Sequence, residues 1–208
     1  MSTYSVNEIS LTARNVVVVL LLGLLGGCAS SPSDSSREPV EGGIHIVENR
    51  SVDASVRDDF NAAIALLEQK QYEPAVQVLK KVIAGSQNNS APYINIAIAY
   101  VMLDETELAE ENFKQALSIN PNHPVAINEY ALLLRRAGRY DEARALYDRA
   151  VSKYPEYMPV RKNYGILCEL YLDDAPCALE HYEVYSENTP EDEDVKLWIT
   201  TLKQKLGV

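Results

Sequence analysis

Two stretches of the chain share one pattern: "AYVMLDETELAEENFKQALSINPNH" at residues 99–123 and "LLLRRAGRYDEARALYDRAVSKYPEY" at residues 132–157. Equivalent residues recur at an offset of 34, in the pairs Ala109 and Ala143, Phe113 and Tyr147, Ala116 and Ala150, and Pro121 and Pro155. A fixed period of this length is typical of arrays in which each repeat is one small supersecondary unit. The sequence therefore predicts a repeat protein.

The repeated residues resemble the tetratricopeptide repeat (TPR), whose unit is a pair of antiparallel helices. The resemblance implies that the small residues Ala97 and Ala109 lie where the two helices touch, and that the Phe113 ring fills the gap to the neighbouring unit. Pro121 ends the second helix because proline lacks an N–H and clashes with the preceding turn. The next unit places the same kinds of residue at the same positions.

Two more units extend the array outward. The segment before the two stretches keeps Ala63, Tyr72 and Ala75 in register, with a turn at Gly85, and the segment after them keeps Tyr164, Gly165, Ala178, Tyr182 and Pro190 with one extra residue between its helices. The predicted units are 56–89, 90–123, 124–157 and 158–191.

The C-terminal stretch "TPEDEDVKLWITTLKQKLGV" (189–208) predicts a capping helix within residues 192–208. Thr189 is the predicted N-cap and Pro190 the predicted first helical residue. One face of this helix is apolar, with Val195, Trp198, Ile199, Leu202 and Leu206 at helical spacing. The predicted fold class is therefore all-α: a TPR solenoid of about four repeats plus a cap that covers the last apolar surface.

The N-terminal region predicts export. Its apolar run, residues 16–29, is shorter than the about 17–25 residues that a membrane-spanning helix needs, so it fits a signal peptide. The end of the run, "LGGC" (25–28), resembles the lipobox of bacterial lipoproteins. The resemblance implies that residues 1–27 are removed and that Cys28 carries a diacylglycerol on its thiol and a further acyl chain, such as palmitate, on its amine. A plain secretory signal or a short anchor is the alternative.

Residues 28–55 are predicted to form a tether, because they are rich in Ser, Pro, Gly and charge. The short alternating stretch "IHIV" (44–47) is taken as part of this linker. Ala29 after the lipidated cysteine, by resemblance to enterobacterial sorting rules, favours the outer membrane with the protein facing the periplasm. The inner membrane and the cell surface are the alternatives.

The composition argues against several function classes. The net charge is -11, and nucleic-acid binding needs clustered Lys and Arg, so no nucleic-acid partner is expected. The histidines His45, His123 and His181 are scattered, and the sequence contains no HExxH, CxxC or GxSxG motif. We expect no metal, no cofactor and no enzymatic activity.

Two cysteines follow Cys28 in the chain. Cys168 falls in the first helix of the last repeat and Cys177 near the start of its partner helix. Nine residues apart across a hairpin, they are able to approach bonding distance. The sequence leaves open a disulfide or two separately buried thiols.

In the TPR family the first helix of each repeat lines a concave face that binds partners. The residues that map to this predicted groove are Phe60, Ile64, Ile94, Ile98, Met102, Asn128, Leu132, Arg135, Arg136 and Lys162. This groove is apolar at its N-terminal end and basic at its C-terminal end, which favours an amphipathic or extended peptide with acidic groups that meet Arg135 and Arg136. As alternatives, the apolar residues belong to the core between repeats and the arginines are solvated.

These features predict a membrane-anchored adaptor that binds other envelope proteins and helps to assemble a multiprotein complex. With its "NYG" stretch (163–165), the predicted TPR lipoprotein resembles the PilF/PilW-type pilotins, which implies a role with a type IV pilus or its secretin. NlpI-like regulators of peptidoglycan synthesis or hydrolysis, and accessory subunits of TonB/Tol energy-transducing systems, are the alternatives. The oligomeric state stays open.

The lipobox leads to a direct test. Cys28→Ser removes the thiol that would be acylated, so the protein should leave the membrane fraction while its fold is unchanged. Membrane fractionation with immunoblotting measures the first effect and circular dichroism the second. A Cys28→Ser protein that stays in the membrane fraction would contradict lipid anchoring.

Overall fold

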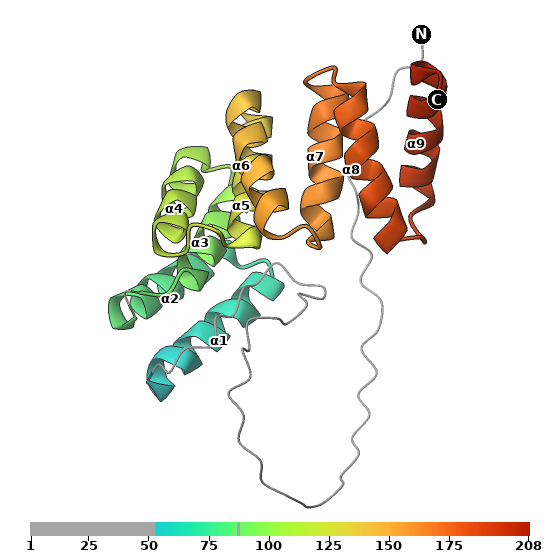
Figure 1. Ribbon diagram of the computed structural model, residues 1–208. Coiled ribbons are helices and arrows are strands. Elements are labelled where there is room, and N and C mark those ends of the chain that lie inside the picture. The colour runs from blue at the N-terminus through green and yellow to red at the C-terminus, as the bar shows by residue number, and fades with distance from the viewer. Residues whose placement is uncertain (1–52, 87) are drawn as a thin grey trace, which may run out of the picture. The chain divides into compact units, whose positions relative to one another are not determined.

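The computed structural model describes residues 53–86 and 88–208. In this part of the chain the secondary structure is helical, and the successive helices lie in antiparallel pairs (Figure 1). The helices are α1 (Ala54–Glu68), α2 (Tyr72–Gly85), α3 (Ala91–Met102), α4 (Thr106–Ile119), α5 (Pro124–Arg136), α6 (Tyr140–Lys153), α7 (Met158–Leu170), α8 (Ala175–Asn188) and α9 (Glu193–Leu206). The prediction of an all-α solenoid is confirmed.

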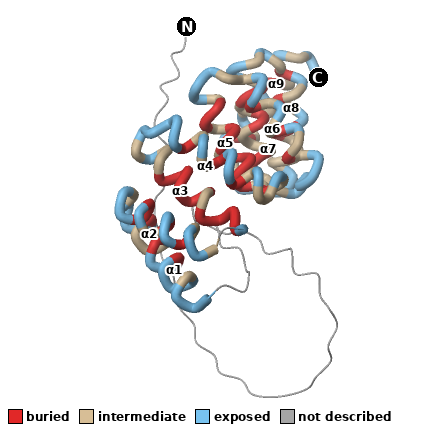
Figure 2. Tube along the Cα trace, turned by 90° about the vertical axis from the view of Figure 1, so that its left-hand side faces the viewer, coloured by how far each residue is buried: buried red, intermediate tan, exposed pale blue. Residues whose placement is uncertain are grey.

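Each helix packs against its neighbours in the chain. The pairs are α1 with α2, α3 with α4, α5 with α6, and α7 with α8, and each pair contacts the next. The first helices of successive pairs also touch, α3 with α5 and α5 with α7, while α9 packs on α8. Figure 2 shows the consequence: buried residues are concentrated on α3 and α5, whereas α1, α2 and α4 carry mainly exposed or intermediate residues.

Small residues lie where the two helices of a pair meet. The alanines at these positions are fully buried: Ala63, Ala75, Ala97, Ala109, Ala131, Ala143 and Ala178. In the last pair Gly165 takes the place of an alanine, and a Cβ there would lie 2.4 Å from Cε1 of the Tyr182 ring. The close approach of α7 and α8 therefore requires glycine at residue 165.

Aromatic side chains join one pair to the next at constant spacing. Phe113 of α4 stacks on Tyr130 of α5 with ring centroids 5.8 Å apart, and the equivalent rings of Tyr147 and Tyr164 lie 5.4 Å apart. A third contact joins Tyr182 to Trp198 at 5.3 Å. Trp198 follows Tyr164 by 34 residues. Helix α9 thus occupies the place of the first helix of a further repeat, whereas the sequence pattern predicts only a cap.

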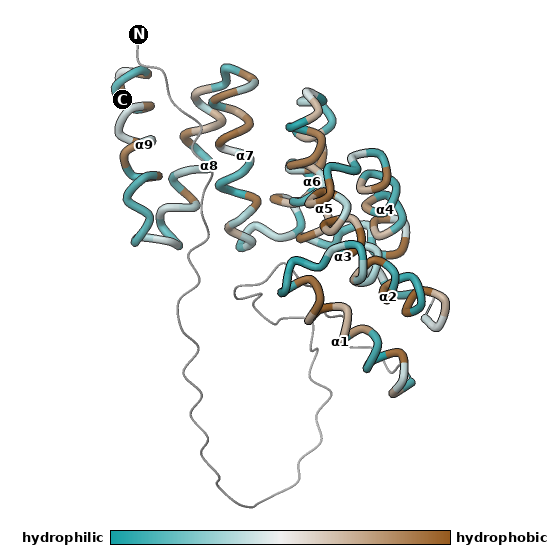
Figure 3. The backbone as a smooth tube through the Cα atoms, turned by 180° about the vertical axis from the view of Figure 1, so that it is seen from behind, coloured by the Kyte–Doolittle hydropathy of each residue, from teal (hydrophilic) through white to brown (hydrophobic). Residues whose placement is uncertain are grey.

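The start of the last helix differs from the prediction. Thr189 ends α8 and its hydroxyl donates to the Tyr185 carbonyl oxygen at 2.6 Å, so it does not cap the following helix. The N-cap is Asp192, whose carboxylate accepts the Val195 N–H at 3.2 Å. A carboxylate at this position also complements the positive end of the helix. Figure 3 shows α9 with mainly hydrophilic or neutral residues, as expected for a terminal helix.

A disulfide joins Cys168 of α7 to Cys177 of α8, with the Cα atoms 5.9 Å apart. The structure thus contains the first of the two arrangements that the sequence left open. Closing a loop of this length restricts the unfolded chain and stabilises the fold by about 2–3 kcal/mol. The last pair of helices is therefore tied covalently as well as by packing.

The predicted signal peptide, Cys28 and the tether up to residue 52, with its 44–47 stretch, lie outside the described residues. The predicted end of the tether at residue 55 is wrong, because α1 already begins at Ala54. Within the described ranges, none of the helices combines the length and the apolar character that crossing a bilayer requires. The anchoring predictions therefore stay predictions.

The contact at Gly165 gives a stability test. Gly165→Ala forces a methyl group against Tyr182 and should lower the free energy of unfolding by about 1–3 kcal/mol, as overpacking does. The sign of the change in the free energy of unfolding is diagnostic, because Gly→Ala at an unconstrained helical position raises this free energy by about 0.5–1 kcal/mol. Urea unfolding followed by circular dichroism measures both effects. The control is Ala62→Gly at an exposed position of α1, and a Gly165→Ala protein more stable than its parent would contradict the packing.

Candidate functional site

The structure corrects part of the predicted groove. Phe60, Ile94, Ile98 and Asn128 are buried, with at most 8 % of each residue exposed. They therefore belong to the core between the helices. Of the other apolar members, Ile64 and Leu132 are half-buried and Met102 is exposed.

Asn128 has a structural role in this core. The side-chain amide of Asn163 on α7 donates to Asn128 Oδ1 at 3.0 Å, and Asn128 donates to Glu129 Oε1 at 2.9 Å. Burial raises the pKa of Glu129, although this hydrogen bond and the charge of Arg136 act in the opposite direction. The predicted groove asparagine therefore links α5 to α7.

Lys162 is also held by its own chain. Its ammonium group donates to Asp192 Oδ2 at 2.6 Å and lies over the rings of Tyr185 and Trp198, at 5.3 and 5.5 Å from their centroids. Tyr185 donates to the same carboxylate oxygen at 3.0 Å. Because Asp192 caps α9, Lys162 fastens the last helix to α7.

The accessible part of the predicted groove lies at the C-terminal ends of α3, α5 and α7. Met102 is 49 % exposed and Leu170 is 66 % exposed. Arg136, which lies between them in the sequence, is also exposed. These three residues are spaced by 34 and so hold the same position in successive repeats. Together with Arg135 and Tyr171, which is 42 % exposed, they are called the edge surface below.

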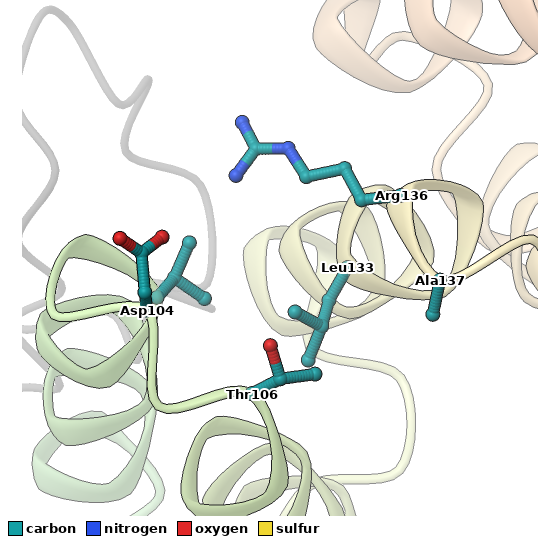
Figure 4. A pocket seen from close by; sticks show the side chains of 6 residues that line it. Asp104, Thr106, Leu133, Arg136 and Ala137 are labelled. Atoms are coloured by element: carbon teal, nitrogen blue, oxygen red, sulfur yellow. The ribbon is translucent and has the colours of Figure 1, made fainter.

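A pocket adjoins the edge surface between the α3–α4 turn and the end of α5 (Figure 4). Its lining residues are Val101, Asp104, Thr106, Leu133, Arg136 and Ala137. In Figure 4 the Asp104 carboxylate and the Arg136 guanidinium reach over the pocket from opposite sides, with Leu133 and Thr106 below them. The pocket thus has a largely apolar base and one charge of each sign on its rim.

The neighbouring Arg139 has carboxylate partners for its guanidinium group. It donates to Glu110 at 2.6 Å and to Glu142 at 2.7 Å. Burial alone would raise the pKa of Glu110, but hydrogen bonds from Arg139, Lys114 and Tyr130 lower it to about 2. This cluster links α4 to α5 and to the turn before α6.

Arg135 and Arg136 differ from Arg139, because within residues 53–86 and 88–208 neither of them forms an ion pair. The Arg135 guanidinium lies over the Tyr171 ring, 5.6 Å from its centroid. Its Nη1 atom is buried and has no hydrogen-bond partner among the described residues. The edge surface therefore presents two cations that form no ion pair with the described residues.

Sequence reasoning missed several members of this site. Leu170 could have been predicted from the sequence, because it follows Arg136 by the repeat length of 34 residues. Tyr171, Asp104 and Thr106 lie in or beside turns, where the helical pattern carries no information about accessibility.

Comparison with known proteins agrees with this fold. Tetratricopeptide-repeat family profiles match residues 105–163 and 59–84. The chain carries tetratricopeptide repeats. PilF of Pseudomonas aeruginosa is structurally similar at 23% identity, with a TM-score of 0.66 over 73% of this chain and 69% of PilF.

Two other solved structures share the fold. MamA 41-end from Desulfovibrio magneticus RS-1 is similar at 17% identity, with a TM-score of 0.65 over 76% of this chain and 88% of that one. A TPR protein from Parabacteroides merdae has 20% identity and a TM-score of 0.60 over 73% of this chain and 59% of its own. Tetratricopeptide repeats generally serve in protein–protein interaction, and the two profile matches place such repeats in this chain.

Proposed function

We propose that this TPR protein is an adaptor without catalytic activity, held by lipid on Cys28 at the outer membrane and facing the periplasm. There it binds other envelope proteins and assists the assembly of a multiprotein complex such as a type IV pilus or its secretin. The observation that carries the adaptor role is the edge surface, where exposed Met102, Leu170 and Tyr171 flank two cations without an ion pair in the part of the chain that the structure describes.

Three further observations support the placement and the complex. The "LGGC" stretch at 25–28 resembles a lipobox. The Cys168–Cys177 disulfide suits an oxidising compartment such as the periplasm, because disulfides are rare in the reducing cytosol. The similarity to PilF favours the pilus role over the peptidoglycan and energy-transducing alternatives.

Site-specific photocrosslinking in the native envelope tests the adaptor role. A photoreactive amino acid at Met102 or Leu170 should capture the same few envelope proteins, with pilus-assembly or secretin components among them, as identified by mass spectrometry. The matched control is Leu108, an exposed apolar residue on α4, which should not capture them. Failure to crosslink at both edge positions, or identical products from Leu108, would contradict the proposal.

A further inference from the structure

The edge surface has an alternating chemical character. Met102, Arg136 and Leu170 hold one repeat position, so three successive repeats present an apolar, a basic and an apolar side chain. Their helices pack side by side in the order α3, α5, α7. Packed helices have axes about 8–10 Å apart. In a β-strand side chains three residues apart point to opposite faces, whereas a polyproline II segment has three residues per turn and advances about 3.1 Å per residue. Side chains three residues apart in a polyproline II segment therefore lie on one face at this spacing.

We propose that the edge surface binds a partner segment in the extended polyproline II conformation, in which an acidic residue has an apolar residue three positions before it and another three positions after it. This inference rests on the proposed adaptor function and names the chemistry of the partner. The carboxylate lies on Arg136 and Arg135. One apolar side chain packs at Met102 and the pocket beside it, and the other packs on Leu170 and Tyr171.

The geometry of Arg135 favours an anionic group at the centre. The Tyr171 ring holds the guanidinium in place, so less rotamer entropy is lost when a partner binds. The Nη1 atom of Arg135 is buried without a hydrogen-bond partner among the described residues. Arginine N–H groups paired with a carboxylate form strong, charge-assisted hydrogen bonds, often two at once. Arg136 adds a second, exposed cation beside it.

The position of Asp104 fixes where the carboxylate goes. This residue faces Arg136 across the pocket (Figure 4), so a partner carboxylate on the pocket side would meet a like charge. The pocket base of Val101, Leu133 and Ala137 accepts an apolar side chain instead. The acidic residue of the partner therefore belongs between the apolar ones and not beside Met102.

The inference is tested with labelled peptides and the full chain purified in detergent. The probe is fluorescein-labelled Leu-Ser-Ser-Glu-Ser-Ser-Leu, compared with versions that carry Gln or Lys at the centre, and binding is followed by fluorescence anisotropy. The Glu peptide should bind about tenfold more tightly than the Gln peptide, the usual advantage of a hydrogen bond to a charged group, and more tightly still than the Lys peptide. Replacing both Leu residues of the probe by Ser should abolish binding.

A charge reversal makes the test specific. Arg136→Glu should remove the preference for the Glu peptide, because the new carboxylate offsets the charge of Arg135. Lys81→Glu is the matched control, because it makes the same charge change at an exposed position of α2 and should leave the preference unchanged. Circular dichroism verifies that both variants are folded.

Equal binding of the three peptides, no binding of the Glu peptide, or an unchanged preference in Arg136→Glu would overturn the inference. These outcomes are separable from failure of the adaptor function. If Met102 and Leu170 still crosslink to envelope proteins, only the partner chemistry is wrong. If the charge preference holds but neither residue crosslinks to any envelope protein, the partner chemistry stands and the adaptor function fails.

Discussion

The array depends on one packing constraint: a small residue where the helices of a pair meet, followed by a large ring that reaches the next pair. Alanines such as Ala97 and Ala109 let the helices approach closely, and the rings of Phe113 and Tyr147 fill the space that this geometry leaves between repeats. Protein interiors are close-packed, so volume removed at one position has to be supplied at another. The offset of 34 residues, lengthened by one in the second helix of the last pair, keeps both positions in register along the chain.

The same packing continues into α9. Because Trp198 takes the ring position of Tyr164 one repeat later, α9 packs on α8 as the first helix of a repeat does. Lys162, Asp192 and Tyr185 then fasten it with polar contacts, and the Cys168–Cys177 disulfide braces the pair on which it rests.

The repeat pattern was sufficient to predict the fold, because helix contacts in a solenoid are local in sequence and recur at one period. The site was harder to predict. Family resemblance identified the correct helices, but it did not show that Ile94 and Ile98 are enclosed while Met102 on the same helix is exposed. Family resemblance also predicted that Lys162 contacts a binding partner. Instead Lys162 forms an ion pair with Asp192, which lies in the next unit and which repeat spacing does not identify. Accessibility and ion pairing depend on neighbours that sequence spacing does not specify.

The central claim is that partners meet the C-terminal ends of the first helices and not their buried middle turns. Thiol labelling tests it most directly, with single cysteines at Met102, Leu170, Ile94 or Ile98 in a Cys28→Ser background that keeps the Cys168–Cys177 disulfide. The account predicts rapid maleimide labelling at Met102 and Leu170. At Ile94 and Ile98 the reaction should be about 100-fold slower or more, because it waits for local opening of the core. Equal rates at the four positions would contradict the account.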